Sequence, residues 1–206
     1  MHAQPFWFFE RTRSKYPDHF NNKRVLEVGA LDTINYHNKN VIDWRLKSLF
    51  NNCDYTSTDL ELGPNVDLAC ETHNLNFPDE TFDTIISSEC FEHDMFWQFS
   101  IKNIIRMLKP GGLFTFSTAT TGRPIHGTEF SGENNHSSPF TIKRGKMWAN
   151  FYKNFEPYDF LTIEEFSKFR YLEFEKSILG GPFLNLNDLY FRGIKLTDDV
   201  IQGQIS

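Results

Sequence analysis

The sequence predicts an α/β fold with a doubly wound, mostly parallel sheet. Short apolar runs that stop at glycine or at an acid, typical of buried strands, alternate with stretches of helical periodicity. Repeated strand–helix–strand units imply parallel strands with helices on both faces of the sheet. The last two apolar runs follow each other without a helix, which predicts an antiparallel pair at the end of the sheet.

The first half of the chain provides the alternation. Phe9, Arg13, Tyr16 and Phe20 recur about one helical turn apart and predict a helix within residues 5–20, packed against the sheet or closing over a pocket as a lid. The strands expected next are 23–29, 53–60, 65–71 and 81–89, with a helix over 41–50.

The second half begins with a helix over residues 95–109 that Pro110-Gly111-Gly112 closes, followed by a strand over 113–120. Residues 121–158 are rich in Gly, His, Asn, Ser and Pro and form a long excursion, of the kind that is usually functional or disordered. Thr162 and Glu165 have capping-box spacing and predict a helix start. Strands over 171–179 and 188–196 follow, joined by Gly180-Gly181-Pro182.

Length and composition suggest one domain over residues 1–206, with an N-terminal helical segment over 1–22 and a loop insertion over 121–158. The net charge of −6 and the isoelectric point of 5.6 disfavour nucleic acid and anionic membranes as partners. Three cysteines without metal or redox spacing indicate free thiols in a reducing compartment, so the expected location is cytoplasmic. We find neither an apolar run long enough to span a membrane nor a secretion signal.

Acidic residues end the predicted strands, where a doubly wound sheet binds its ligands. A carboxylate after the second strand can accept the hydroxyls of a ribose, and one after the third can accept from an adenine amino group. No basic residue is present to meet a pyrophosphate, and only Gly29 remains of a glycine-rich turn. The pattern therefore favours an adenosine that carries no phosphates.

Four segments complete the pattern: VLEVGALD, YTSTDLE, CETHNLNFPDETFDTIISSECFEH and LKPGGLFTFSTA. In order and spacing they resemble the motifs of class I S-adenosylmethionine-dependent methyltransferases, in the branch that includes many small-molecule and glycan enzymes. The resemblance covers about residues 23–119. It implies a Rossmann-like, seven-stranded sheet with an antiparallel last strand, and S-adenosyl-L-methionine as the cofactor.

The resemblance also implies a set of cofactor-binding residues. Glu27 and Gly29 would lie at the amino-acid end of the cofactor, Asp59 at the ribose and Leu60 against the adenine. The edge of the adenine would be contacted by Glu71, His73 and Asn74. The sulfonium side of the pocket would be lined by Ser88 and Glu89. Leu31 and Thr33 depart from the family pattern, because they stand where the common motif has further glycines.

Two histidines are candidates for the base that deprotonates the methyl acceptor. His93 follows the fourth strand, and His126 lies in the long loop after the fifth; His93 could instead cap a helix or brace the loop. Around His126 are other hydrogen-bonding residues, which favour a small polar acceptor such as a saccharide over an apolar one: Arg123, Glu129, Asn134, Asn135 and His136. An ordinary solvated loop would have the same composition.

No metal site is expected, because the spacing of the candidate ligands His93, Asp94, His126 and His136 is irregular. The leading hypothesis is therefore methyl transfer to an oxygen or nitrogen atom. Two alternatives stay open at this point. One is a catalytically inactive, methyltransferase-like binding or scaffold protein, and the other is an NAD-dependent oxidoreductase.

Overall fold

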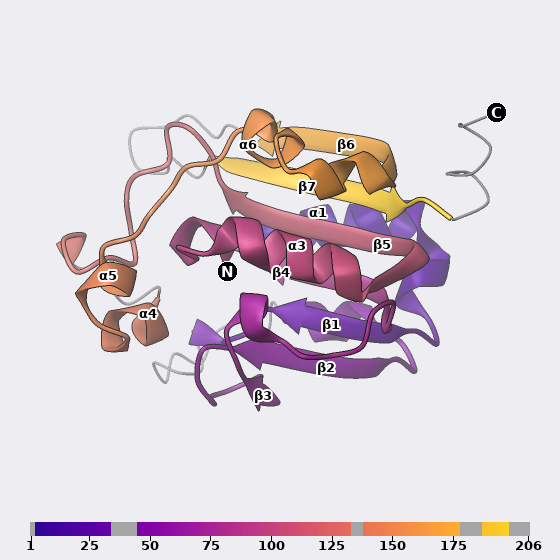
Figure 1. Ribbon diagram of the computed structural model, residues 1–206, viewed down its shortest axis with the longest axis horizontal. Coiled ribbons are helices and arrows are strands. Elements are labelled where there is room, and N and C mark those ends of the chain that lie inside the picture. The colour runs from indigo at the N-terminus through magenta and orange to yellow at the C-terminus, as the bar shows by residue number, and fades with distance from the viewer. Residues whose placement is uncertain (1–2, 34–44, 133–137, 178–186, 198–206) are drawn as a thin grey trace.

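A seven-stranded sheet forms the centre of the protein, which is represented by a computed structural model that describes residues 3–33, 45–132, 138–177 and 187–197. The strand order is β3-β2-β1-β4-β5-β7-β6 (Figure 1). The strands are β1 (Arg24–Val28), β2 (Asp54–Asp59), β3 (Leu68–Ala69), β4 (Phe82–Ser88), β5 (Leu108–Ala119), β6 (Phe169–Ser177) and β7 (Asp188–Lys195). β1 to β5 pair in parallel, whereas β7 is antiparallel to both β5 and β6. The predicted α/β class and the antiparallel ending are confirmed.

Helices cover both faces of this sheet. In Figure 1, α3 and α6 lie in front of the strands and α1 lies behind them. The α-helices are α1 (Ala3–Lys15), α3 (Trp97–Met107), α4 (Pro139–Lys143), α5 (Lys146–Ala149) and α6 (Pro157–Leu161). The 3-10 helices are η1 (Pro17–Phe20), η2 (Leu46–Leu49), η3 (Thr72–Asn74), η4 (Phe91–His93) and η6 (Glu164–Lys168).

Phenylalanine side chains dominate the core on both faces. Phe8 and Phe9 of α1 are fully buried with Ile86, Leu113 and Tyr190 on one face of the sheet. This packing supports the prediction of a helix against the sheet rather than a lid. The larger core lies on the other face, between the sheet, α3, α6 and η6. Within it the rings of Phe116 and Phe191 stack with centroids 5.1 Å apart, where offset packing of aromatic rings is favourable.

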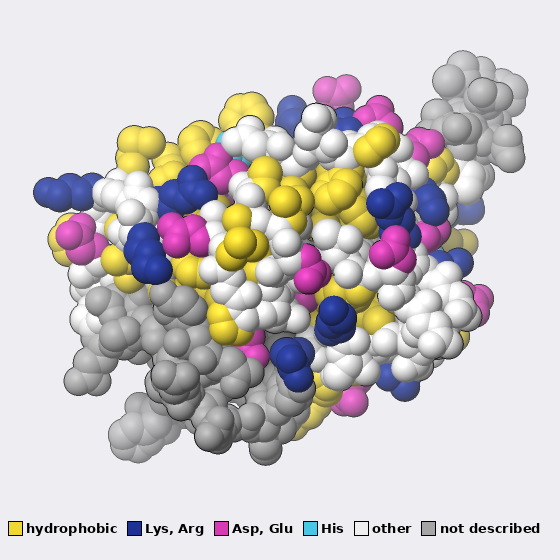
Figure 2. Space-filling model, turned by 90° about the horizontal axis from the view of Figure 1, so that it is seen from below, with side chains coloured by type: hydrophobic (Ala, Val, Ile, Leu, Met, Phe, Trp, Pro, Cys, Tyr) yellow, Lys and Arg dark blue, Asp and Glu magenta, His cyan; other side chains and the backbone are white. Residues whose placement is uncertain are grey.

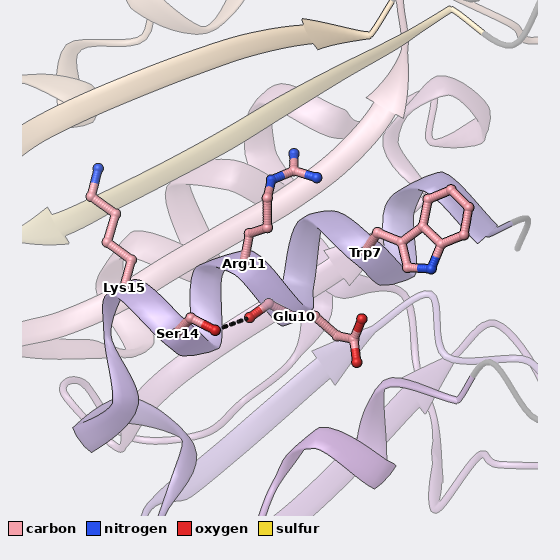
Figure 3. Close-up of a pocket in the computed structure, with 5 residues that line it drawn as sticks. All are labelled: Trp7, Glu10, Arg11, Ser14 and Lys15. Carbon is pink, nitrogen blue, oxygen red and sulfur yellow. Dashed lines mark hydrogen bonds between the residues drawn. The ribbon is translucent and has the colours of Figure 1, made fainter.

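Ion pairs also attach α1 to the far edge of the sheet. Arg11 pairs with Glu175 at 2.6 Å and Lys15 with Glu173 at 2.5 Å, both acids being on β6. Figure 3 shows the shallow hollow along α1 that Trp7, Glu10, Arg11, Ser14 and Lys15 line, with Arg11 and Lys15 extending toward the neighbouring strands. This hollow lies along α1 and not at the carboxyl ends of the parallel strands.

Two sequence-based boundaries were wrong. β5 begins at Leu108, so Pro110-Gly111-Gly112 lies within the strand as a bulge between the pairs Phe82–Leu108 and Thr84–Leu113. A bulge leaves residues unpaired, which tolerates a proline that has no N–H to donate.

Thr162 and Glu165 do not form a capping box. The Thr162 hydroxyl donates to the carbonyl of Asp159 and ends α6, and only the 3-10 helix η6 follows. The capping box belongs instead to Glu156 and Asp159 at the start of α6. Of the helix predicted over 41–50, the described part forms η2, and 41–44 lie outside the described residues, as does Gly180-Gly181-Pro182.

The surface bears on the expectation that neither nucleic acid nor a membrane is a partner. Among the described residues, no helix is both long and apolar enough to cross a membrane. On the face drawn in Figure 2, lysine and arginine side chains are scattered among acidic and apolar ones rather than gathered into a basic patch.

We predict that Phe116→Ala lowers the free energy of unfolding by about 3–5 kcal/mol, because it leaves a cavity in the aromatic core beside Phe191. Phe130→Ala is the matched control: its ring is 81% exposed, so the change should stay within about 0.5 kcal/mol. Urea denaturation followed by circular dichroism measures both. Equal losses in the two variants would contradict this account of the core.

Candidate functional site

The predicted site residues gather at one edge of the sheet. Because β1, β2, β4 and β5 are parallel, their carboxyl ends meet there, and Figure 1 shows α4 and α5 beyond the ends of β1 and β2. Ligands of doubly wound sheets bind at this edge.

Glu27 is buried near the end of β1, with 6% of its surface exposed. One carboxylate oxygen, Oε2, accepts hydrogen bonds from the hydroxyl of Tyr55 at 2.7 Å and from the amide of Asn65 at 3.2 Å. Burial raises the pKa of Glu27 to about 7, although these two hydrogen bonds oppose the shift. A cation beside this carboxylate would stabilise its ionised form.

Gly29 follows β1 with a φ of +70°, a conformation that side chains rarely adopt. A Cβ atom at Gly29 would lie 2.4 Å from both the Cβ and the Sγ of Cys90, so the glycine is required for the approach of this neighbour. In the structure it is therefore Cys90 that approaches Gly29 closely, and contact of Gly29 with a cofactor stays a prediction. Burial raises the pKa of the Cys90 thiol well above its usual value, which makes it a poor nucleophile.

Asp59 joins the end of β2 to the turn after β1. Its Oδ2 accepts from the backbone N–H of Leu31 at 2.9 Å, and its Oδ1 accepts from that of Leu60 at 2.7 Å. Burial raises the pKa of Asp59 to about 6, against the effect of these two hydrogen bonds. Leu31, where the common motif has a second glycine, therefore anchors the turn through its backbone.

Beyond β3, Glu71, His73 and Asn74 lie together in and before η3. Asn74 donates to Glu71 Oε2 at 2.8 Å, and His73 Nε2 lies 3.4 Å from the same oxygen. Arg144, which follows α4, donates to Glu71 Oε1 at 2.7 Å and to the carbonyl of Leu60 at 2.8 Å. A basic side chain from the long excursion thus lies between the two groups predicted to hold the adenine, where the sequence indicated none.

At the end of β4, Ser88 and Glu89 lie beside β5. The hydroxyl of Ser88 is 3.0 Å from that of Ser117, and Glu89 has a φ of +53°. Left-handed backbone at a residue other than glycine is strained, and such strain clusters at functional sites. Arg123 from the loop after β5 lies 3.4 Å from Glu89 and also pairs with the fully buried Asp188.

The two candidate bases, separated by 33 residues in the sequence, come together here. The ring centroids of His93 and His126 are 5.0 Å apart, and the ring of Tyr152 lies 5.5 Å from the first and 5.0 Å from the second. Phe91 anchors η4, which presents His93, because its fully buried ring makes edge contacts with Phe116 in the core.

Glu92 completes this cluster. Its side chain is fully buried, and its Oε2 accepts from the hydroxyl of Thr118 at 2.8 Å. Burial and the nearby Glu89 raise the pKa of Glu92 to about 8. Burial also lowers the pKa of His93 well below its usual value, so its imidazole is neutral at physiological pH.

Some predicted residues do not join the cluster. Asp94, named as a conceivable metal ligand, uses its carboxylate to accept from the backbone N–H of Phe96 and the hydroxyl of Ser100. Glu129 is exposed, and Asn134, Asn135 and His136 lie outside the described residues.

The sequence analysis missed Glu92, Tyr152 and Arg144 as site residues. Glu92 directly precedes His93, and this adjacency to a candidate base was the one feature of the sequence that could have pointed to Glu92. Tyr152 and Arg144 lie within the excursion of residues 121–158, where no periodicity fixes the direction of a side chain. Only the fold brings them to the strand ends.

Comparison with known proteins agrees with this arrangement. Residues 47–116 match a family model described as a methyltransferase domain, and no curated protein matches the chain significantly. Solved structures resemble it at 15% sequence identity or less, which compares folds and not substrates.

Three of these structures illustrate the likeness. The 1,6-didemethyltoxoflavin-N1-methyltransferase of Burkholderia thailandensis, with 1,6-didemethyltoxoflavin and S-adenosylhomocysteine bound, has a TM-score of 0.54 and 15% identity over 96% of this chain and 92% of that one. The YcgJ protein of Bacillus subtilis has a TM-score of 0.58 and 13% identity over 92% and 99%. Phosphoethanolamine N-methyltransferase 2 of Haemonchus contortus, in complex with S-adenosyl-L-methionine, has a TM-score of 0.57 and 14% identity; 91% of this chain covers 53% of that one.

The strand order and the antiparallel β7 define a Rossmann-like α/β fold of the methyltransferase type. Together with the match of residues 47–116 to the methyltransferase-domain model, they support an S-adenosylmethionine-dependent methyltransferase.

We predict that stability falls as the pH rises from 5 to 8, in part because of Glu27. A folded-state pKa of about 7 against an ordinary 4.5 means that its contribution is present below pH 4.5 and lost as the pH rises through 7. The loss is at most about 3 kcal/mol. Glu27→Gln, followed by urea denaturation across this pH range, should show a shallower decline, with the Asp59 and Glu92 contributions remaining. An unchanged slope in the variant would refute the assignment to Glu27.

Proposed function

We propose that the protein transfers a methyl group from S-adenosylmethionine to an oxygen or nitrogen atom of a small polar acceptor, with saccharides as the favoured class. The observation that supports this most directly is the position of the His93–His126 pair. It lies beside the end of β4, next to the strand ends where buried carboxylates suit a cationic cofactor.

The donor set fits the cofactor in charge. Glu27 and Asp59 are carboxylates whose pKa values burial raises, so both would gain from a positively charged ligand. Glu27 would hold the amino-acid end and Asp59 the ribose hydroxyls, for which each of its oxygens has a lone pair beyond its bond to a backbone N–H. When bound, S-adenosylmethionine supplies a methyl group on a sulfonium that is already a good leaving group.

At the adenine end, Leu60, Glu71, His73 and Asn74 are the proposed contacts. Arg144 shares this place, since it donates to both Glu71 and the Leu60 carbonyl. If Glu71 accepts a hydrogen bond from the adenine amino group, Arg144 must therefore share the carboxylate of Glu71 or move away from it. Gly29, Ser88 and Glu89 would line the path from the amino-acid end to the acceptor side.

On the acceptor side, the histidine pair provides the proton acceptor that a hydroxyl needs for methyl transfer. His126 suits the role of base best. Its Nδ1 lies 3.0 Å from the carbonyl of Pro124, and because a carbonyl only accepts, Nδ1 must carry the proton and Nε2 the lone pair. His93, buried and neutral, would position the acceptor or take the proton in its place.

The polar groups around the pair favour a saccharide or a similar polar metabolite. Arg123, Glu92 and Tyr152 border the space near the two rings and can donate to or accept from hydroxyl groups. The structures from Burkholderia and Haemonchus belong, by their names, to enzymes that methylate nitrogen in small molecules. Their likeness supports a small-molecule acceptor as a hypothesis and says nothing of a sugar.

We further propose that residues 1–206 act as one domain, with 121–158 as the acceptor-side insertion, and that the protein is cytoplasmic. The insertion supports the first point by reaching both ends of the site, through Arg144 at β3 and Tyr152 at β4. The free cysteines Cys53, Cys70 and Cys90 support the second.

We predict micromolar binding of S-adenosylhomocysteine by isothermal titration calorimetry. Asp59→Ala should weaken it by roughly tenfold or more, because the variant loses a ribose acceptor and releases the Leu31 turn. Asp54→Asn is the matched control, since Asp54 is exposed at the opposite end of the same strand and should leave the affinity unchanged.

The same preparations should then be offered S-adenosylmethionine with a panel of methyl glycosides, polar amines and flat aromatic amines, and the release of S-adenosylhomocysteine followed. Turnover with a polar acceptor that His126→Ala reduces supports the proposal. Absence of cofactor binding at millimolar ligand would rule out the transferase function, and turnover with the aromatic amines alone would rule out the polar acceptor.

A further inference from the structure

Three side chains on the acceptor side converge like the ligands of a metal ion. Glu92, His93 and His126 each offer one ligand atom, and these atoms lie within 4.8 Å of one another. Ligands around a tetrahedral ion at about 2.1 Å are roughly 3.4 Å apart, so the three atoms need to approach one another by at most about 1.4 Å.

Polar atoms of this cluster are buried without a partner. Glu92 has 0% of its surface exposed, and its Oε1 has no hydrogen-bond partner among the described residues. The same holds for Nδ1 of His93, of which 7% is exposed. Burying such atoms without a partner is unfavourable, because the hydrogen bonds they made to water are not replaced. A cation bound between them would satisfy both.

Neighbouring groups orient the ligands as they do in metal sites. Thr118 donates to Glu92 Oε2 at 2.8 Å, which restrains the carboxylate and leaves Oε1 available to a cation. The Pro124 carbonyl accepts from Nδ1 of His126, which makes Nε2 the nitrogen with a lone pair. Hydrogen bonds of this kind, behind the ligand atoms, set the tautomer and the direction of metal-binding side chains.

The local charge also suits a cation. Arg123 is the nearby positive group, and it pairs with Glu89 and with Asp188. These two carboxylates offset the positive charge of the guanidinium that a cation beside Glu92 would otherwise meet. The rings of Tyr152 and His126, with centroids 5.0 Å apart, form a wall beside it.

We propose that Glu92, His93 and His126 bind a first-row divalent transition-metal ion, such as Zn²⁺. Two imidazoles and one carboxylate are a donor set that suits Zn²⁺, Mn²⁺ or Fe²⁺, whereas Mg²⁺ and Ca²⁺ prefer oxygen ligands alone. Three protein ligands leave positions open for water or another small oxygen ligand.

The site also refines the role of the two histidines, and this part rests on the proposed function. A hydroxyl group of the acceptor that occupies an open position would have a lowered pKa beside the cation and would release its proton to solvent. His93 and His126 would then be ligands of the metal and not free bases. Acceptors with a hydroxyl group able to reach the metal would be the favoured substrates.

Binding of the metal is tested on the full chain, without any acceptor. The protein is treated with chelator, dialysed and titrated with Zn²⁺ by calorimetry, and its Co²⁺ form is examined for visible absorption bands. We expect one equivalent of Zn²⁺, a raised midpoint of thermal unfolding in its presence, and no comparable binding of Mg²⁺.

Glu92→Gln and His126→Gln should each weaken Zn²⁺ binding by about 100-fold or more, since loss of a direct ligand exceeds the loss of an outer partner. His19→Gln is the matched control, because His19 lies near Asp83 at the other end of β4, and its affinity for Zn²⁺ should equal that of the unmodified chain. Circular dichroism checks that each variant folds, and the His126 variant, in a loop, serves if the buried Glu92 variant does not.

No stoichiometric Zn²⁺ binding, an affinity for Zn²⁺ in both cluster variants unchanged from that of the unmodified chain, or a preference for Mg²⁺ would each overturn the metal site. Titration of the same metal-free samples with S-adenosylhomocysteine separates this result from failure of the proposed function. If the samples bind S-adenosylhomocysteine but not Zn²⁺, the proposed methyltransferase function stands and only the proposed metal site is refuted.

Discussion

The parallel pairing of β1 with β4 is the interaction on which the rest of the site depends. Residues Val25 to Val28 align with Thr84 to Ser87, so the chain leaves both strands at the same level. Cys90 can then pack onto Gly29, and this contact joins the cofactor side of the edge to the acceptor side. Without the glycine, the two turns would be held apart by a side chain.

A second constraint is the burial of charge around that contact. Glu27, Asp59 and Glu92 are all carboxylates whose pKa values burial raises, and carboxylates of this kind cluster at functional sites. The first two are the proposed contacts of the cationic cofactor, and the third is a proposed ligand of the metal ion. The acidic edge is therefore electrostatically prepared for positive ligands on both sides of Cys90.

The aromatic core holds these costly groups in place. Phe91 is buried among Phe114, Phe116 and Phe160 and fixes the short helix that presents Glu92 and His93. Phe155, which is also fully buried, donates its N–H to the carbonyl of Ala119 and so holds the segment that contains Tyr152 against the end of β5. The free energy gained by packing these rings is what permits unpaired polar atoms beside them.

The sequence by itself determined the sheet and the strand ends, because apolar runs that stop at an acid or a glycine report local structure. It identified Glu27, Asp59 and Glu71, and it named His93 and His126 as separate alternatives. Only the tertiary structure decided that the two histidines meet, that Glu92 joins them and that Arg144 reaches Glu71. These contacts link residues up to 84 positions apart through loops without periodicity, and hydrogen bonding and packing between distant segments fix them. The bulge at Pro110 was also decided by the tertiary structure. In the sequence the proline indicates the end of a helix, but pairing of this segment with β4 places it in a strand.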